Sequence, residues 1–449
     1  MEQHLLDQAL VQVQAYLEAG DIAGAIALVE ALRPPDQADV FEELHIGEQE
    51  ILLPRLDVED AADILEELEN EDAAELASLF DARTLGRILD EMATDEAADL
   101  LGDLKPLQVS QALAQMVDAG GVQSLLEFPD DSAGGLMTTE FLPLRRDMTA
   151  AQALVALRKW APEDEAAYYL FVTDPMGRLC GAVRLMELIK APPTARLHEV
   201  MDTDVISIRA DADQEECARL ISRYDVMSLP VVDEQGVLIG LITIDDLVDV
   251  LEDEATEDMQ RLGGTVPLGR RYLDTPVLQV ASKRVGWLLL LIVTGTLTAT
   301  VMRSFESLLS AEVALAFFVP LVIGTGGNAG SQTTATIIRA LAIGDVDWRD
   351  VIKVFWHESR TGLLLGLAMA IVGFIRALTW GTSVPMALAV SSGLLTIVLW
   401  ANVVGALLPL LASRLKIDPT VISGPLMSTL VDATGLFIYL AIARAILLT

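Results

Sequence analysis

Five apolar segments in the C-terminal part of this 449-residue chain restrict its fold more than any other feature. A helix needs about 20 mainly apolar residues to cross a bilayer, and each segment reaches or approaches that length. The sequence therefore predicts a domain of five helices that spans a lipid bilayer. The segments are residues 285–302, 313–341, 362–378, 386–411 and 421–448.

Loop charges predict the orientation of these segments. Lys283 and Arg284 precede the first segment, four basic residues follow the second, and Arg414 and Lys416 separate the fourth from the fifth. Because cytoplasmic loops are enriched in lysine and arginine, we expect a cytoplasmic N-terminus and an external C-terminus. Residues 1–10 lack the cationic start and apolar core of a signal peptide, which agrees with this orientation.

Asp432 is the only acidic residue inside any of the long apolar segments. A carboxylate in such a place is costly unless it faces water, a partner or a cation, so the default interpretation is functional. The chain has no equally deep cation, and the predicted partner is a permeating ion. Mg²⁺ fits because it prefers oxygen ligands and keeps several of its waters. No His or Cys lies nearby to suggest a zinc or copper site.

The second apolar segment is rich in glycine and in neutral oxygen donors. Residues 320–341 (PLVIGTGGNAGSQTTATIIRAL) contain four glycines, and Asn328, Gln332, Thr333 and Thr334 supply oxygens without charge. Glycines here favour either close helix packing or a local opening of the backbone, and both alternatives stay open. Proline and glycine also surround Asp432 in the fifth segment.

Negative charge is concentrated before the membrane segments. The chain carries a net charge of −36, whereas the part from residue 285 onward has eight acidic and nine basic residues. Such an acidic region repels nucleic acid and anionic lipid, so divalent metal ions are its natural partners. The alternative is that the acids only keep the region soluble.

Residues 1–130 are expected to form an α-helical superhelix. The stretch EDAADILEEL (59–68) recurs as DEAADLLGDL (95–104), with a partial copy at residues 71–80. Repeats of this period usually stack as helix pairs. Predicted helix caps are Asp21, Asp57 and Thr94.

Residues 131–252 are expected to form an α/β module. A strand–turn–strand–helix order occurs twice, each time after a helix. The first copy has a predicted strand over Tyr168–Val172 and a helix over residues 185–189, and the second copy ends in a predicted helix over residues 244–251, before the connecting helix. The second copy, residues 205–247, resembles a CBS domain, a family in which a Thr-x-x-Asp often holds an adenosine ribose. Thr243 and Asp246 stand at that place, although a simple helix cap explains Asp246 equally well. The first copy has RLMEL there and lacks the pattern.

Taken in order, these parts are similar to the MgtE family of magnesium channels and transporters along essentially the whole chain. The motifs that carry the resemblance are GTGGNAGSQ (324–332), RALAIGDVDWRD (339–350), KIDPTVISGPL (416–426) and TLVDATGLFIYL (429–440). The resemblance implies a multidomain homodimer in a bacterial cytoplasmic membrane. Its expected parts are an acidic helical N domain (1–130), a tandem CBS pair (131–252), a connecting plug helix with a linker (253–282) and a five-helix transmembrane domain (283–449).

The resemblance also implies how such a protein works. Asp432 of two subunits would face each other in a pore on the two-fold axis and bind hydrated Mg²⁺, with Asp418 near the cytoplasmic end. Mg²⁺ binding between the cytosolic domains would close the pore, and the CBS pair would bind ATP. The candidate sensor acids are Glu59, Asp90, Asp95, Asp211, Glu215, Glu216, Asp253, Glu254, Glu257 and Asp258. A divalent cation between facing acidic surfaces turns repulsion into attraction and favours the compact state.

Ser331 and Gly424 stand where the family often has asparagine, and this departure keeps a second interpretation open. The chain could be a broader divalent-cation transporter that passes Co²⁺ or Mn²⁺. A third interpretation is a membrane-anchored nucleotide or ion sensor without conductance. We expect no enzyme, because no nucleophile–base pair, P-loop or metal-hydrolase signature occurs.

Overall fold

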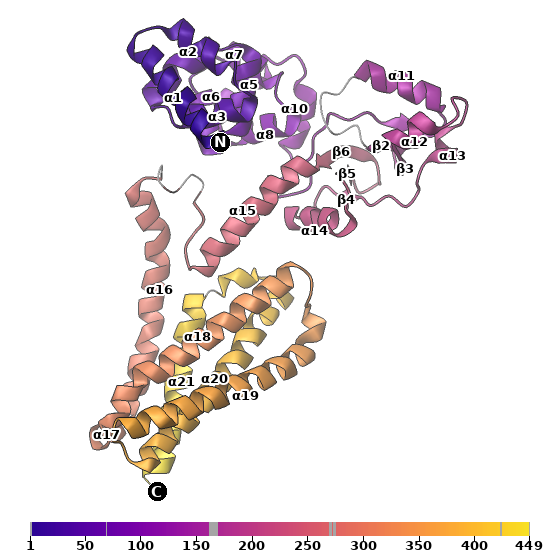
Figure 1. Cartoon of the computed structure of the whole chain (residues 1–449). Helices are drawn as coiled ribbons and strands as arrows, with labels where there is room; N and C mark the ends of the chain where they lie inside the picture. The colour runs from indigo at the N-terminus through magenta and orange to yellow at the C-terminus, as the bar shows by residue number, and fades with distance from the viewer. Residues whose placement is uncertain are drawn as a thin grey trace. The chain divides into compact units, whose positions relative to one another are not determined.

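The computed structural model describes residues 2–68, 70–160, 169–268, 272, 275–422 and 424–448. The chain divides into two compact units, Met1–Asp253 and Glu254–Thr449. Figure 1 shows both units, coloured along the chain.

The first unit begins with short helices that share one hydrophobic core. The core includes Phe41, Ile64 and Leu101, all almost inaccessible to solvent. Both copies of the predicted repeat are helical, at α5 and α8, and the partial copy is α6, which confirms a helical N-terminal region. The helices are α1 (Glu2–Glu18), α2 (Ile22–Val29), α3 (Pro34–Glu42), α4 (Ile46–Leu52), α5 (Val58–Glu67), α6 (Asn70–Ala77), α7 (Ala82–Leu89), α8 (Thr94–Asp103), α9 (Pro106–Leu113) and α10 (Ala119–Leu125).

Two of the three predicted helix caps are correct. The Asp21 carboxylate accepts from the backbone N–H of Gly24, and the Asp57 carboxylate accepts from that of Val58. Thr94 is not a cap, because α8 begins at Thr94 itself. Its hydroxyl instead accepts a 3.0 Å hydrogen bond from the backbone N–H of Thr139. The side chain therefore joins the helical region to the segment that leads into the sheets.

Two small sheets with the same strand order follow. In each, the first strand pairs parallel with the second, and the second pairs antiparallel with the third. This repetition agrees with a tandem CBS pair; Tyr168, predicted to begin a strand, lies outside the described residues. The strands are β1 (Leu144–Arg145), β2 (Tyr169–Thr173), β3 (Leu179–Arg184), β4 (Ile208–Arg209), β5 (Ser228–Val232) and β6 (Leu238–Thr243). The helices are α11 (Ala150–Trp160), α12 (Leu185–Lys190), α13 (Leu197–Val200), α14 (Gln214–Tyr224) and α15 (Ile244–Leu262).

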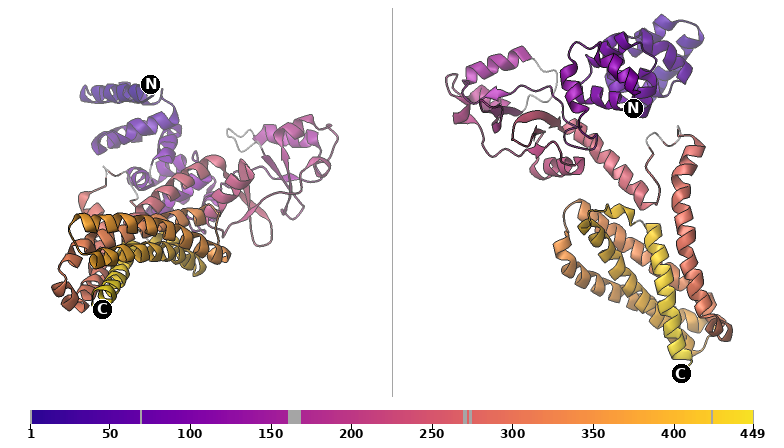
Figure 2. Two further views of the ribbon diagram at one scale, coloured as in Figure 1. Left: turned by 60° about the horizontal axis from the view of Figure 1, so that its bottom comes forward. Right: turned by 180° about the vertical axis from the view of Figure 1, so that it is seen from behind.

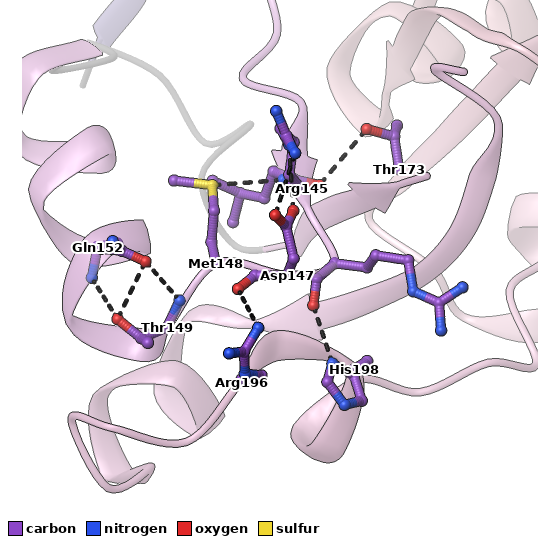
Figure 3. A network of polar contacts seen from close by, with 10 residues as sticks. Arg145, Asp147, Met148, Thr149, Gln152, Thr173, Arg196 and His198 are labelled. Carbon is purple, nitrogen blue, oxygen red and sulfur yellow. Dashed lines mark hydrogen bonds and ion pairs between the residues drawn. The ribbon is translucent and has the colours of Figure 1, made fainter. Parts of the chain in front are cut away.

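Polar contacts fix the connection after β1 in the first copy (Figure 3). Arg145 forms an ion pair with Asp147, with 3.0 Å between Nη2 and Oδ2. Arg196 donates to the backbone carbonyl of Asp147 at 3.4 Å, and the His198 ring contacts the carbonyl of Arg146 at 3.1 Å. These bonds hold the turn before α11 against α13.

The helix after the second sheet is longer than the sequence predicts. We expected a helix over residues 244–251 and a separate connecting helix, whereas α15 is continuous from Ile244 to Leu262. No glycine or proline interrupts this stretch, so nothing in the sequence ends the helix earlier. Leu247 and Val250 are buried near its beginning, and its C-terminal half belongs to the second unit.

Among the described residues, five helices are long and apolar enough to cross a membrane, which confirms the predicted number. Helix α20 packs against α18, α19 and α21, α18 also packs against α21, and α16 lies beside α21 (Figure 2). The Tyr439 hydroxyl of α21 donates to the carbonyl of Leu315 in α18 inside this bundle. The five helices are α16 (Val277–Ser304), α18 (Ala314–Ala342), α19 (Val351–Thr379), α20 (Val384–Arg414) and α21 (Gly424–Leu447), and the short α17 (Glu306–Ala311) precedes α18.

The glycine-rich segment packs closely and does not open. Helix α18 is continuous from Ala314 to Ala342. A side chain at Gly326 would collide with Ile397 of α20, and one at Gly330 would come within 3.0 Å of Met427 of α21. Of the two alternatives left by the sequence, close packing is therefore the one observed.

We expect Gly326→Val to lower the free energy of unfolding by about 1–3 kcal/mol, because the added methyl groups would overpack the contact with Ile397. Gly324→Val is the matched control, since a side chain at Gly324 meets nothing within 4 Å. Thermal unfolding of the two purified variants in detergent measures the difference. Equal unfolding temperatures for Gly326→Val and Gly324→Val would show that the contact with Ile397 does not limit the size of residue 326.

Candidate functional site

Asp432 lies on α21 directly opposite a glycine of α18. A Cβ atom at Gly327 would be 3.4 Å from Asp432 Oδ1, so the absence of a side chain there makes room for the carboxylate. Asp432 is half-buried, and Asn328, the residue after Gly327, is exposed. Among the described residues, no cationic side chain forms an ion pair with Asp432. The carboxylate is thus accessible and lacks a charge partner within the described chain.

Further polar groups share the side of the bundle on which Asp432 lies. The Ser331 hydroxyl donates to the carbonyl of Gly424 at 3.1 Å and lies 3.2 Å from the Ser428 hydroxyl. We call this surface the α18–α21 polar face. Its members, which these contacts bring together, are Gly327, Ser331, Gly424, Ser428 and Asp432.

Two of the predicted oxygen donors do not join this face. The hydroxyl of Thr333 donates to the Asn402 side chain at 2.9 Å, and that of Thr334 donates to the carbonyl of Gly405 at 3.1 Å. Both threonines are buried against α20. They connect helices and have no access to an ion on the α18–α21 polar face.

Asp418 stands in the connection between α20 and α21 and has a cationic partner. Its Oδ2 accepts from Arg261 of α15 at 2.6 Å and from the Thr420 hydroxyl at 2.6 Å. Arg261 also forms an ion pair with Glu257. Burial raises the pKa of Asp258, and the Asp418 carboxylate raises it further. This part of the second unit therefore collects three carboxylates around one guanidinium.

Four acids form an acidic cluster in the first unit: Asp95, which is buried, and Glu96, Asp99 and Asp246, which are half-buried. Asp95 is 7% exposed, and its Oδ1 has no hydrogen-bond partner among the described residues. Burial raises the pKa of Glu96 to about 9 and that of Asp99 to about 7, with neighbouring carboxylates adding to the effect. Burial raises the pKa of Asp95 as well, and Asp246 contributes to that shift. A cation near these oxygens would stabilise their ionised forms.

Asp246 belongs to this acidic cluster, which changes its interpretation. Its carboxylate accepts a 2.5 Å hydrogen bond from the Thr243 hydroxyl and a 3.2 Å bond from the Thr243 backbone N–H. Burial raises its pKa. A ribose hydroxyl would have to compete with Thr243 and approach Asp95, whereas a divalent cation would relieve the repulsion between the two acids.

The other predicted sensor acids are dispersed. Both oxygens of Asp90 accept from the backbone N–H of Val117 at 2.9 Å, so this carboxylate fixes a loop. Asp211 is paired with Arg209, which lowers the pKa of Asp211; Arg145 and Asp147 form the same pair in the first copy. Glu216 pairs with Arg219 at 3.2 Å. Glu59, Glu215 and Asp253 are exposed and Glu254 is half-buried.

No three His, Cys, Asp or Glu side chains among the described residues have the arrangement of a preformed metal site. The described residues therefore do not place three such side chains where they could coordinate one metal ion directly. Mg²⁺ usually keeps several waters and needs only one or two carboxylates, so the acidic cluster and Asp432 are compatible with a hydrated Mg²⁺ ion.

A cavity of about 890 Å³ lies between the two copies of the tandem pair, at the end of β3 of the first copy. Its walls include Tyr169, Arg184, Glu187 and Tyr224, but neither Thr243 nor Asp246. Arg184 ends β3 as Thr243 ends β6, and Glu187 follows three residues later as Asp246 does. The cavity therefore occupies the first-copy equivalent of the predicted ribose site.

Sequence reasoning missed Glu96, Asp99, Arg261 and Ser428. The first two stand in the second copy of the repeat, and only their burial separates them from exposed acids such as Glu59. Arg261 is 157 residues from Asp418 in the chain, so no local pattern reveals their pairing. Ser428 lies one turn before Asp432, and that spacing was the available signal.

Comparisons with known proteins agree on one family. Family models match at residues 319–442 (divalent cation transporter), 32–131 (MgtE intracellular N domain) and 197–253 (CBS domain). The chain is 46% identical to the magnesium transporter MgtE of Thermus thermophilus over 326 residues, which cover 73% of this chain and 72% of that protein. It is 35% identical to MgtE of Bacillus subtilis, with 73% and 72% covered.

A solved structure resembles the first unit. It is described as the cytosolic domain of the Mg²⁺ channel MgtE in complex with ATP, and it superposes with a TM-score of 0.51 and 36% identity. The match covers 54% of this chain and 99% of the solved one.

The acidic cluster makes the stability of α8 depend on pH. The folded pKa values of Glu96 and Asp99 lie above their ordinary values, so the folded protein binds more protons than the unfolded one between about pH 4 and pH 9. Stability is therefore greatest at acidic pH and falls as the pH rises through that window. We expect faster hydrogen exchange in α8 at pH 8.5 than at pH 6 in EDTA, after correction for intrinsic exchange rates.

Saturating Mg²⁺ or Asp95→Asn should flatten this dependence on pH. Glu59→Gln is the matched control, because Glu59 stands at the equivalent position of the other repeat copy and is exposed. If hydrogen exchange in α8 depends on pH as steeply in Asp95→Asn as in the unmodified protein, the acidic cluster does not cause this dependence.

Proposed function

The chain belongs to the MgtE family of magnesium transporters, and we propose that it conducts Mg²⁺ across the membrane along the α18–α21 polar face. The observation that carries this proposal is the accessible Asp432 carboxylate, which has no cationic partner in the described part of an otherwise apolar bundle. A cost of a few kcal/mol for such a group is compensated when a cation passes it.

A polar face on one side of a membrane bundle needs a second surface to cover it. A second copy of the chain, related by a two-fold axis, would bring two Asp432 carboxylates to the same passage. Two carboxylates with neutral oxygens around them suit an ion that keeps most of its waters. We place the N-terminus in the cytoplasm and the C-terminus outside, as the loop charges predict.

We also propose that cytosolic Mg²⁺ closes the pathway and so contributes to Mg²⁺ homeostasis. The carboxylates of the acidic cluster repel one another when ionised, and a divalent cation would make their compact arrangement favourable. Burial raises the pKa values of Glu257 and Asp258 at the end of α15, and the nearby Asp418 carboxylate raises both of them further. Mg²⁺ between these carboxylates would hold α15 near the cytoplasmic end of α21.

The cavity between the two copies of the tandem pair is the proposed nucleotide site. Its volume of about 890 Å³ and its tyrosine, arginine and lysine side chains suit an adenine ring and phosphates. A relative's cytosolic domain is described in complex with ATP, which supports the same ligand class here.

Asp432→Ala should abolish Mg²⁺ uptake into proteoliposomes, because it removes the ionised group from the pathway, while the oligomeric state on a sizing column stays the same. Glu306→Ala is the control, since Glu306 is exposed on the short helix α17. Uptake of Mg²⁺, Ca²⁺, Co²⁺ and Mn²⁺ is compared. Flux of Co²⁺ and Mn²⁺ equal to that of Mg²⁺ would favour the broader transporter, and absence of any flux in the unmodified protein would favour the sensor.

Neutralising Asp253, Glu254, Glu257 and Asp258 together should raise the internal Mg²⁺ concentration needed for half-inhibition by about tenfold or more, as expected when charged cation ligands are lost. Glu252→Gln is the control, because Glu252 lies on the same helix and is exposed. Uptake is measured with internal Mg²⁺ varied. An unchanged inhibition curve would return these acids to an ordinary solvated helix face.

A further inference from the structure

Two serine hydroxyls join α18 to α21 one helical turn from Asp432. Ser331 Oγ lies 3.1 Å from the carbonyl oxygen of Gly424 and 3.2 Å from Ser428 Oγ. Both serines are half-exposed on the α18–α21 polar face. The bonds therefore connect the two helices at the surface along which the ion is proposed to move.

The geometry fixes the direction of these hydrogen bonds. A hydroxyl has one hydrogen to donate and two lone pairs that accept. The hydrogen of Ser331 goes to the Gly424 carbonyl, which cannot donate, so Ser428 must donate to Ser331. The lone pairs of Ser428 Oγ then remain available as acceptors.

Ser428 and Asp432 present their oxygens to the same space. A Cβ atom at Gly327 would lie 3.3 Å from Ser428 Oγ and 3.4 Å from Asp432 Oδ1. The two residues are four apart on α21, so their side chains lie on one face of the helix. One hydrated ion beside Gly327 can thus contact both oxygens through its waters.

We propose that Ser428, oriented by Ser331, is a specificity-determining residue that accepts a hydrogen bond from the water shell of the cation at Asp432. This inference rests on the proposed conduction of Mg²⁺ past Asp432. Waters bound to Mg²⁺ are held firmly and are strong donors, whereas Ca²⁺ takes more ligands in a flexible shell. A fixed acceptor beside the carboxylate favours the ion that arrives with an ordered set of waters.

Ser428→Ala removes the acceptor, and we expect the ratio of Mg²⁺ to Ca²⁺ uptake to fall by about threefold to tenfold, the value of one hydrogen bond. Ser331→Ala frees the Ser428 hydrogen and should lower the ratio less. The double variant should match Ser428→Ala alone, because Ser331 acts through Ser428. Ser428→Thr keeps the hydroxyl and should restore the ratio.

Ser392→Ala is the matched control, because the Ser392 hydroxyl donates to the Leu388 carbonyl of its own helix. The ratio is measured on one proteoliposome preparation, so it does not depend on the amount of folded protein. An unchanged ratio in Ser428→Ala, with uptake still abolished in Asp432→Ala, overturns the role of Ser428 alone. If Asp432→Ala transports normally, the conduction proposal itself fails. If Ser428→Ala transports no ion, an unchanged ratio in Ser331→Ala overturns the inference.

Discussion

A carboxylate on a membrane helix needs water, a partner or a cation, and the packing around Asp432 follows from that requirement. Gly327 leaves the space that the carboxylate occupies, while Gly326 and Gly330 bring α18 close to α20 and α21. Larger residues at these three places would separate the helices or cover the carboxylate. The glycines thus allow a tight apolar bundle to carry an ionisable group at its surface.

The acidic cluster of the first unit also contains carboxylates that are partly removed from water, and there a bound proton can neutralise the charge. The acidic cluster is buried at Asp95 and half-buried at its other three residues, and this partial loss of water makes Glu96 and Asp99 hold their protons more firmly than an exposed carboxylate does. A group that titrates near neutral pH gains most from a cation that replaces the proton. Burial therefore turns ordinary acidic residues into groups whose charge state depends on the ions around them.

Most of the fold could be predicted from the sequence, because apolar length and repeated patterns are local signals. The five apolar helices and the repeat helices occur where they were expected. Helix α19 begins at Val351, eleven residues before the predicted segment, since its first three turns carry Lys353, Glu358 and Arg360 among apolar residues yet form helix. Continuity of α15 was missed for a similar reason: a change in composition at Glu252 resembled a boundary, although no residue there breaks a helix.

The site was predictable only in part, because its contacts join residues far apart in the chain. Asp432 could be identified from its own segment, since a lone acid among apolar residues is a local anomaly. The partners of Asp95 and Asp418 could not, because burial and pairing depend on the packed helices.

Arg261 shows what this difference means for mechanism. In the described chain Asp418 already has a cation, a guanidinium tethered to α15, whereas Asp432 has none. A permeating ion would therefore meet a neutralised carboxylate at Asp418 and an unpaired one at Asp432. On the proposed mechanism, Mg²⁺ must compete with Arg261 for Asp418 before it can join Glu257 and Asp258 to that carboxylate. The single positive charge of Arg261 neutralises the three carboxylates of Glu257, Asp258 and Asp418 less well than a divalent cation does. Because Mg²⁺ must displace Arg261 from Asp418, it would win this competition only at high concentration. On the proposed mechanism, the charges at the end of α15 would thus contribute a Mg²⁺ threshold for closure in addition to the acidic cluster.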